Sequence, residues 1–321
     1  MTKWNDLDSA LKAQKTFSDY FYDSSKLSND QKIESLKTLS LALHSEISEL
    51  CNAVNYKEHR REARETDLQK ILYKSTDAYR YILAIANLWG ITADRLTSAL
   101  EQKDHYLHYR HRLKEKKWNG EPIVLFDIDD VLAEFRYEFC KFVTAQTGIF
   151  IDSNCAEYYN TVKFKEHGLN SEYFFKQFID DHGIMRLDLN KRYYDLLISL
   201  KSRGYWIQMI TARDANNLTC FYDTYAWLHL NNIPADDVVF TPEKFAWVAG
   251  QDFYKTARLF AVDDSAKHAS EYAKHGVTCV VPKKSYNVEV KDVKGIIYVD
   301  DNDNVLDEIS DLILSHKYIV L

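Results

Sequence analysis

The spacing of apolar residues along the chain changes near residue 118. Before this point they recur every three or four residues, which is the spacing of one face of an amphipathic helix. Two such series are Leu36, Leu39, Leu43, Ile47, Leu50 and Val54, and Ile71, Ala78, Ile82, Ile85 and Trp89. Residues 4–22 and the stretch from Thr92 to Lys117 are typical of further helices, with Gly90 as a stop signal before the last. The pattern predicts an all-α helical bundle over residues 1–117.

Beyond Pro122 the apolar residues form short runs that alternate with helical stretches. The runs span residues 123–128, 207–211, 238–240, 259–262, 277–281 and 296–299. Runs of this kind, separated by helices, are typical of strands buried on both faces of a parallel sheet. The charged segment 114–121 contains an Asn-Gly turn and is interpreted as a linker. We therefore expect two domains, 1–117 and an α/β domain over 118–321 with a Rossmann-like parallel sheet.

Composition narrows the class of protein. The 321 residues are 46% hydrophobic and 14% aromatic, which is enough apolar material for two buried cores. The formal net charge of −7 argues against a whole-protein electrostatic grip on nucleic acid. The five cysteines contain no C-x-x-C pair, so we expect neither a zinc site nor a disulfide framework. A polar N-terminus and the lack of a membrane-length apolar stretch lead us to expect a soluble, cytoplasmic protein without a membrane partner.

Carboxylates directly follow two of the predicted strands. Asp127 and Asp129 end the run 123–128, and their spacing of two places both side chains on one side of an extended chain. Asp263 and Asp264 end a later run in the same way. The carboxyl ends of parallel strands lie at one edge of a sheet, where ligands bind in such folds. Like charges this close need a cation, and carboxylate oxygens are hard ligands suited to Mg²⁺, so we expect a magnesium site.

Other strand ends carry groups suited to phosphoryl transfer. This reaction requires a nucleophile, an acid for the leaving oxygen, and positive charge around the moving phosphoryl group. Thr211 ends one run and offers a hydroxyl, and Arg213 follows it. Lys244 follows the run 238–240 at a predicted helix start, where a phosphate would lie. Lys244 is therefore the favoured cation, and Lys255 stays open as the alternative.

Together these positions resemble the four motifs of the haloacid dehalogenase-like hydrolases. The motifs are Asp127-Ile128-Asp129-Asp130-Val131, Ile210-Thr211-Ala212-Arg213, Lys244 at a helix start, and Val262-Asp263-Asp264-Ser265. The resemblance covers the whole C-terminal domain, and it implies a helical cap inserted between the first two motifs, at about residues 135–190. One departure is Asp130, because the family often has Gly at that position.

The resemblance also implies a role for each motif residue. Asp127 would attack phosphorus, and Asp129 would protonate the leaving oxygen and then activate water. Thr211 and Lys244 would hold the phosphoryl oxygens. Mg²⁺ would be bound by Asp127, the carbonyl of Asp129, and Asp263, Asp264 or both.

The residues after the first motif indicate a substrate class. The stretch 131–135 (VLAEF) resembles the 5′(3′)-deoxyribonucleotidase branch, and the inserted cap is rich in aromatic residues that can stack on a base. The resemblance implies a phosphatase for (deoxy)nucleoside monophosphates, in which we expect Arg213 to bind substrate. The polynucleotide 3′-phosphatases are the alternative branch. They would be expected to show a basic groove, and the net charge argues against one.

Acidic residues also lie on the predicted N-terminal helices. Glu46 and Glu49 are three apart, which places them on one side of a helix, and Asp77 flanks the apolar stripe of the next. With Lys57 in an Asn-Tyr-Lys stretch between them, they resemble the all-α nucleoside-triphosphate pyrophosphohydrolases, which include MazG-like proteins and dimeric dUTPases. The resemblance implies Mg²⁺ at Glu46, Glu49 and Asp77 and substrate binding by Lys57. Lys74 departs from the family, which has Glu at this position.

Joined in one chain, the two domains would convert a (d)NTP to a (d)NMP and then to a nucleoside and phosphate. We therefore expect an Mg²⁺-dependent nucleotidase of nucleotide pool metabolism that forms a homo-oligomer through its helical domain. The alternatives are a polynucleotide 3′-phosphatase with a helical accessory domain, and an N-terminal domain that only binds nucleotides or dimerises. The base, the sugar, the position of the phosphate and the effect of Lys74 stay open.

Overall fold

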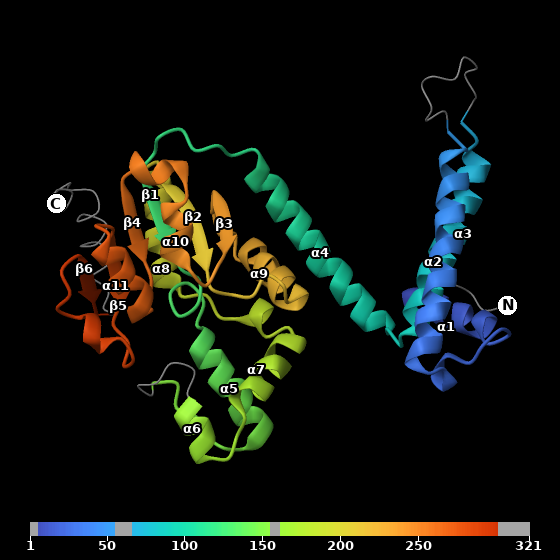
Figure 1. The fold of residues 1–321 in the computed structure, drawn as a ribbon, viewed down its shortest axis with the longest axis horizontal. Coiled ribbons are helices and arrows are strands. Elements are labelled where there is room, and N and C mark those ends of the chain that lie inside the picture. Colours follow the sequence, from blue (N-terminus) through green and yellow to red (C-terminus); the bar gives the residue numbers. More distant parts are fainter. Residues whose placement is uncertain (1–5, 55–65, 155–160, 301–321) are drawn as a thin grey trace. The chain divides into compact units, whose positions relative to one another are not determined.

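The computed structural model describes residues 6–54, 66–154 and 161–300. Contacts divide the chain into two compact units, Met1–Glu101 and Gln102–Leu321, which Figure 1 colours from blue to red along the sequence. Among the described helices, none is both long enough and apolar enough to cross a membrane.

The described part of the first unit is helical. It contains α1 (Leu7–Ser18), the short 3-10 helix η1 (Ser24–Lys26), α2 (Asn29–Cys51), α3 (Leu68–Leu88) and the first turns of α4 (Ala93–Lys114). Capping boxes at Asp6 and Ser28 begin α1 and α2 by satisfying free backbone amides. The long helices α2 and α3 pack side by side (Figure 1), and Leu11 and Leu83 join α1 to α3 in a small core. Because α2 has no buried residue, most of its surface faces away from this core.

The second unit is built on a six-stranded sheet in which all neighbouring strands are parallel. The strands are β1 (Ile123–Phe126), β2 (Trp206–Thr211), β3 (Asp237–Phe240), β4 (Leu259–Val262), β5 (Thr278–Pro282) and β6 (Ile296–Val299), in the order β3-β2-β1-β4-β5-β6. The α/β parallel sheet predicted from the apolar runs is confirmed. In register, Phe126 lies opposite Met209 and Val262, so the central strands end at similar levels and present the residues that follow them along one edge.

Helices cover both faces of this sheet. They are α8 (Lys191–Ser202), α9 (Leu218–Leu230), α10 (Lys244–Ala249), the 3-10 helix η4 (Asp252–Lys255), α11 (Ala266–Lys274) and the 3-10 helix η5 (Val288–Val290). Alternate residues of β1 point to opposite layers: Val124 and Phe126 belong to the core beneath α8 and α9, and Ile123 and Leu125 to the core beneath α10 and α11. This double burial explains why the strands read as continuous apolar runs.

A group of helices is inserted between β1 and β2. It comprises α5 (Phe135–Thr147), α6 (Thr161–Glu166), α7 (Ser171–Asp180) and the 3-10 helix η3 (Ile184–Arg186), and Figure 1 shows α5, α6 and α7 gathered away from the helices that flank the sheet. Phe139 lies at its centre, with its ring 5.6 Å from that of Phe178 and 5.8 Å from that of Phe164. All three rings are buried, so these aromatic residues hold the insertion together rather than face a ligand.

The boundary between the units falls within α4. Tyr109 on its second half is fully buried, and its hydroxyl donates to the carbonyl of Ile233 at 2.9 Å. Tyr106 packs edge-on against Tyr225 of α9 at 4.9 Å. These contacts assign the helix from Gln102 onward to the second unit, whereas sequence composition places the boundary at 117/118. The reason is that α4 is uninterrupted, so no turn or loop residue marks the change of packing partner.

Candidate active site

Three buried carboxylates and one buried lysine meet at the carboxyl ends of the central strands. Asp127 follows β1, and Asp263 and Asp264 follow β4. A carboxylate oxygen from each of the three lies within 4.8 Å of the other two. Lys244, the first residue of α10, places its Nζ 2.8 Å from Oδ2 of Asp127 and 2.7 Å from Oδ2 of Asp263. Residues far apart in sequence therefore form one compact charged cluster.

The sheet itself fixes these side chains. The amide of Asp127 donates to the carbonyl of Val262 at 2.9 Å, and that of Asp263 donates to the carbonyl of Val280 at 3.1 Å. Both aspartates thus continue the hydrogen-bond ladder of a parallel strand for one residue. A side chain at this place is held rigidly at the edge of the sheet, which favours a preorganised site.

Burial sets the electrostatics of the cluster. It raises the pKa of Asp127 to about 7, an effect that Lys244 opposes and that Asp263 reinforces. Burial also raises the pKa of Asp264 well above its usual value. The pKa of Lys244 is raised because attraction to Asp127 and Asp263 outweighs its own burial. Three acids against a single lysine leave the cluster short of positive charge, and three carboxylate oxygens in a small space suit Mg²⁺. The residues present therefore fit a divalent cation.

Asp129 is held by Arg213. The Arg213 guanidinium donates from Nε to Oδ2 of Asp129 at 2.9 Å and from a second nitrogen to Oδ1, which is a two-pronged ion pair. It also donates to Oγ1 of Thr224 at 3.0 Å. The Asp129 carboxylate, a quarter of which is exposed, lies outside the group formed by Asp127, Asp263 and Asp264. Arg213 was expected to bind substrate. In the structure its guanidinium is paired with Asp129, the expected acid-base residue.

Thr211 is fully buried at the end of β2. Its hydroxyl oxygen accepts from the amide of Arg213 at 3.2 Å, and its carbonyl accepts from the amide of Thr241 at 2.8 Å. The structure thus ties this residue to the loops after β2 and β3.

The structure separates the two candidate lysines. Lys244 is 1% exposed and bridges two of the carboxylates. Lys255 ends the 3-10 helix η4 and is exposed. Only Lys244 therefore occupies the cluster.

Tyr286 and Asn287, which sequence reasoning missed, support Asp264. The Tyr286 hydroxyl donates to Oδ2 of Asp264, and Asn287 Nδ2 donates to its main-chain carbonyl at 2.8 Å. The Arg136 guanidinium lies 3.5 Å from the centre of the Tyr286 ring. The main-chain amide of Arg136 donates to Oδ1 of Asp130 at 2.8 Å. Tyr286 and Asn287 carry no sequence signal because neither belongs to a strand-end motif.

The backbone conformation of Asp130 explains how the first motif can have Asp where the family often has Gly. Its φ is 55°, which is the left-handed region that glycine adopts most easily and that Asp tolerates better than most residues. The amide of Asp130 donates to the carbonyl of Ala133 at 2.7 Å. The tight turn after Asp129 therefore survives without glycine.

A separate charged cluster lies in the first unit. Glu46 and Glu49 on α2 and Asp77 on α3 lie around Lys74. Its Nζ is 3.0 Å from Glu46, 2.8 Å from Glu49 and 3.7 Å from Asp77. Lys57, the expected substrate-binding residue, lies outside the described residues.

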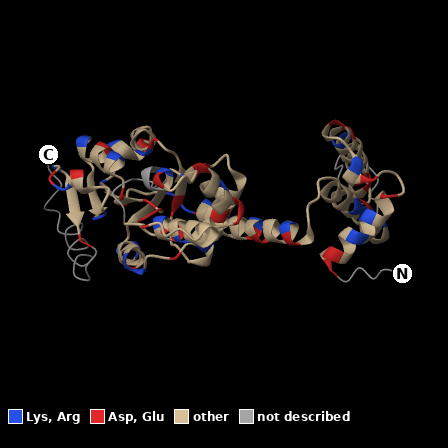
Figure 2. Cartoon of the chain, turned by 90° about the horizontal axis from the view of Figure 1, so that it is seen from below, with Lys and Arg blue, Asp and Glu red and all other residues tan. Residues whose placement is uncertain are grey.

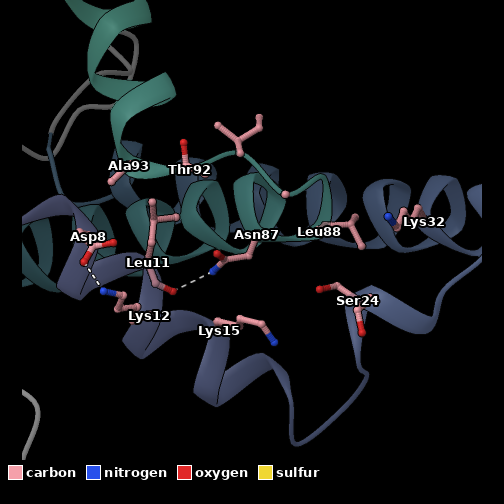
Figure 3. A pocket seen from close by; sticks show the side chains of 13 residues that line it. Asp8, Leu11, Lys12, Lys15, Ser24, Lys32, Asn87, Leu88, Thr92 and Ala93 are labelled. Atoms are coloured by element: carbon pink, nitrogen blue, oxygen red, sulfur yellow. Dashed lines mark hydrogen bonds and ion pairs between the residues drawn. The ribbon is translucent and has the colours of Figure 1, made fainter.

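The cavities formed by the described residues of the first unit include the following two. One, of about 610 Å³, is lined by Gln14, Phe17, Ser18, Phe21, Tyr22, Thr38, Leu39, Ala42, Glu46, Asp77, Arg80, Tyr81 and Ala84. The other, of about 360 Å³, has Lys12, Lys15 and Lys32 on its walls (Figure 3). Lys12 and Lys15 are paired with Asp8 and Asp19 on the same helix, so the second hollow offers less positive charge than its lysines suggest.

No protein-family model matches the chain, and no curated protein does. Among solved structures, it is similar to a predicted phosphatase from Clostridium acetobutylicum, at 15% identity over 61% of this chain and 100% of that chain, with a TM-score of 0.42. It is also similar to a HAD family hydrolase from Deinococcus radiodurans R1 with bound phosphate and sodium, at 14% identity over 61% and 96% of the two chains and a TM-score of 0.42. An L-2-haloacid dehalogenase is similar at 10% identity over 60% and 100%, with a TM-score of 0.39. At such low scores the reaction has to be argued from this chain's own residues.

Proposed function

We propose that the second unit is a Mg²⁺-dependent phosphatase that acts through an aspartyl-phosphate on Asp127. The observation that carries this proposal is the position of Lys244, buried between Asp127 and Asp263 beside Asp264. The cluster brings together the three groups that the reaction requires. The acids supply a nucleophile and metal ligands, and the buried lysine supplies a cation for phosphoryl oxygens. This combination suits transfer of an anionic group and has no evident structural purpose.

The reaction runs in two displacements. In the first, an Asp127 carboxylate oxygen attacks phosphorus while the bond from phosphorus to the leaving oxygen breaks, and Asp129 gives that oxygen a proton. In the second, Asp129 takes a proton from water, whose oxygen attacks phosphorus and releases phosphate from Asp127. Once Asp129 has given up its proton, Arg213 holds its carboxylate through the two-pronged ion pair and orients it for the second step. Mg²⁺, held by Asp127, Asp263 and Asp264 and by the carbonyl of Asp129, would neutralise the charge of the phosphoryl group.

We propose (deoxy)nucleoside monophosphates as the substrate class. The support is the resemblance of residues 131–135 to the deoxyribonucleotidase branch and the aromatic insertion. Most insertion rings are occupied in packing, but Tyr137, Phe150 and Tyr173 are exposed by half or more and are available to a base. Figure 2 shows Lys and Arg interspersed with Asp and Glu along the described chain, which gives the polynucleotide 3′-phosphatase alternative no support from clustered positive charge.

The first unit has two candidate roles. As a (d)NTP pyrophosphohydrolase it would supply monophosphates to the second unit, and the resemblance at Glu46, Glu49 and Asp77 supports this role. As a nucleotide-binding or dimerisation module it would carry no chemistry, and the place of Lys74 among those acids favours this second role.

We also propose that the first unit joins two or more copies of the chain. Large apolar side chains are exposed on α2 and α3, among them Leu41 at 73%, Leu72 at 61% and Tyr73 at 64%. Exposed apolar area of this extent on adjacent helices marks an association surface. Sedimentation equilibrium should show an oligomer that Leu41→Lys or Leu72→Lys shifts toward monomer. A wild-type monomer at micromolar concentration would refute the assembly.

Product analysis on a panel of dNMPs and dNTPs with Mg²⁺ tests the reaction. Wild type should release nucleoside and phosphate from dNMPs, and Asp127→Asn should lower this release to the uncatalysed background. If wild type releases pyrophosphate from dNTPs and Glu49→Gln abolishes this release, activity in the first unit is established. If no monophosphate is hydrolysed, the nucleotidase proposal is wrong. Phosphate release from 3′-phosphorylated oligonucleotides would then point to the alternative branch.

A further inference from the structure

The ion-pair cluster of the first unit has a lysine where a metal ion would be expected. Glu46 and Glu49 extend from α2, and Lys74 and Asp77 extend from the facing side of α3. The Lys74 ammonium contacts all three acids, at 2.8 Å for Glu49, 3.0 Å for Glu46 and 3.7 Å for Asp77. These distances are those of charge-assisted hydrogen bonds for the two glutamates and of an ion pair for the aspartate.

With the Lys74 ammonium between them, the three carboxylates are too spread out to bind a metal ion. A Mg²⁺ ion binds its oxygens at about 2.1 Å, so its ligand oxygens lie within a few ångströms of one another. Within residues 6–54, 66–154 and 161–300, the group that meets a 4.8 Å limit is Asp127, Asp263 and Asp264. Glu46, Glu49 and Asp77 do not meet it. They surround the Lys74 ammonium instead of closing on a common point, so the arrangement does not fit the metal implied by the resemblance.

The charge state of the cluster is stable. Lys74 donates hydrogen bonds to Glu46 and Glu49. A lysine ammonium keeps its proton at neutral pH even without such partners, so the cluster holds a fixed positive charge. A divalent ion would have to displace a fixed positive charge that already satisfies the acids, and its own charge would be repelled by that ammonium at close range.

We infer that Lys74 is a built-in cation that takes the place of a divalent metal ion, so the first unit binds no metal ion at Glu46, Glu49 and Asp77. The ion pairs of Lys74 join α2 to α3, as a metal ion bound by residues of both helices would. The cavity of about 610 Å³ that has Glu46 and Asp77 on its wall then lacks the metal needed to bring a triphosphate against carboxylates. The first unit is accordingly a binding or assembly module and releases no pyrophosphate.

This inference is independent of the phosphatase proposal, and Mn²⁺ titration of the full chain, followed by the electron paramagnetic resonance of free Mn²⁺, tests it. The double variant Glu46→Gln/Glu49→Gln should bind as many Mn²⁺ equivalents as wild type. Lys74→Glu should bind one more equivalent, and adding Glu46→Gln to it should remove that extra equivalent. The inference would be overturned if Glu46→Gln/Glu49→Gln bound one Mn²⁺ equivalent fewer than wild type. It would also be overturned if Lys74→Glu bound no more Mn²⁺ than wild type.

Two controls keep the result interpretable. Asp264→Asn should remove an equivalent that belongs to the second unit, so the two sites are counted separately. Lys74→Gln leaves three acids without a cation and should gain the same additional equivalent. It serves where circular dichroism shows that Lys74→Glu does not fold. Absence of a gain in a folded Lys74→Gln would likewise overturn the inference.

Discussion

Replacing Lys244 by Met removes a positive charge from the most buried part of the second unit while keeping an unbranched side chain of similar length. Lys244 is 1% exposed, and its Nζ lies 2.8 Å from Asp127 and 2.7 Å from Asp263. The substitution therefore leaves two buried carboxylates without their shared partner, beside a third at Asp264. We expect it to destabilise the unit as well as to abolish phosphatase activity.

The magnitude follows from the cost of an unpaired buried charge. Removing one partner of a buried ion pair costs about 3 to 5 kcal/mol, mostly because the remaining charge is still excluded from water. Lys244 serves two such acids, so the upper part of this range is expected, reduced to the extent that the acids bind protons. With a urea m-value of about 2 kcal/mol/M, the midpoint of unfolding should fall by more than about 1 M.

Urea unfolding in EDTA, followed by tryptophan fluorescence, measures this effect. Four of the six tryptophans, at positions 118, 206, 227 and 247, lie in the second unit, so most of the fluorescence change reports on it. Lys255→Met is the matched control, because Lys255 is exposed on η4 and its removal should change stability by less than about 0.5 kcal/mol. Equal effects of the two substitutions, or a larger effect at Lys255, would refute the assignment of Lys244 to the cluster.

Three further predictions concern the second unit. Arg213→Met should lower the free energy of unfolding by about 3 kcal/mol, because it leaves Asp129 without its two-pronged partner, and Arg213→Lys should lower it less; urea midpoints that are equal for the two variants would contradict this. Burial raises the pKa of Asp223 to about 6 from 3.8. The folded state therefore binds a proton that the unfolded state has lost between these values, and wild type should lose about 2 kcal/mol relative to Asp223→Asn as pH rises from 4 to 7. Unfolding measured at both pH values checks this, and a constant difference would refute it. Gly183→Ala should lower the free energy of unfolding by about 1 to 3 kcal/mol, because a Cβ there would overlap the buried ring of Phe178; calorimetry that shows no lower melting temperature would contradict the packing.

The apolar pattern alone determined the architecture of the second unit and which acids follow its central strands. All six apolar runs became strands, because segments buried on both faces must be apolar throughout, and that signal is local. Asp127 and Asp263 could be singled out for the same reason, since acids at the end of such a run have no structural explanation. The rule that parallel strands present their carboxyl ends at one edge then predicted that these residues meet.

Only the tertiary structure decided which charges pair, because the sign and type of a residue do not say which neighbour it reaches. The sequence favours Lys244 and leaves Lys255 open, and the structure decides between them because Lys244 begins a helix against the sheet edge whereas Lys255 lies on the surface. Arg213 reads as a substrate contact, but its position two residues after β2 carries it to Asp129. Lys74 reads as a lost ligand, and the packing of α2 on α3 puts its ammonium among the acids. Ion pairing depends on distances of a few ångströms between elements, and packing sets those distances.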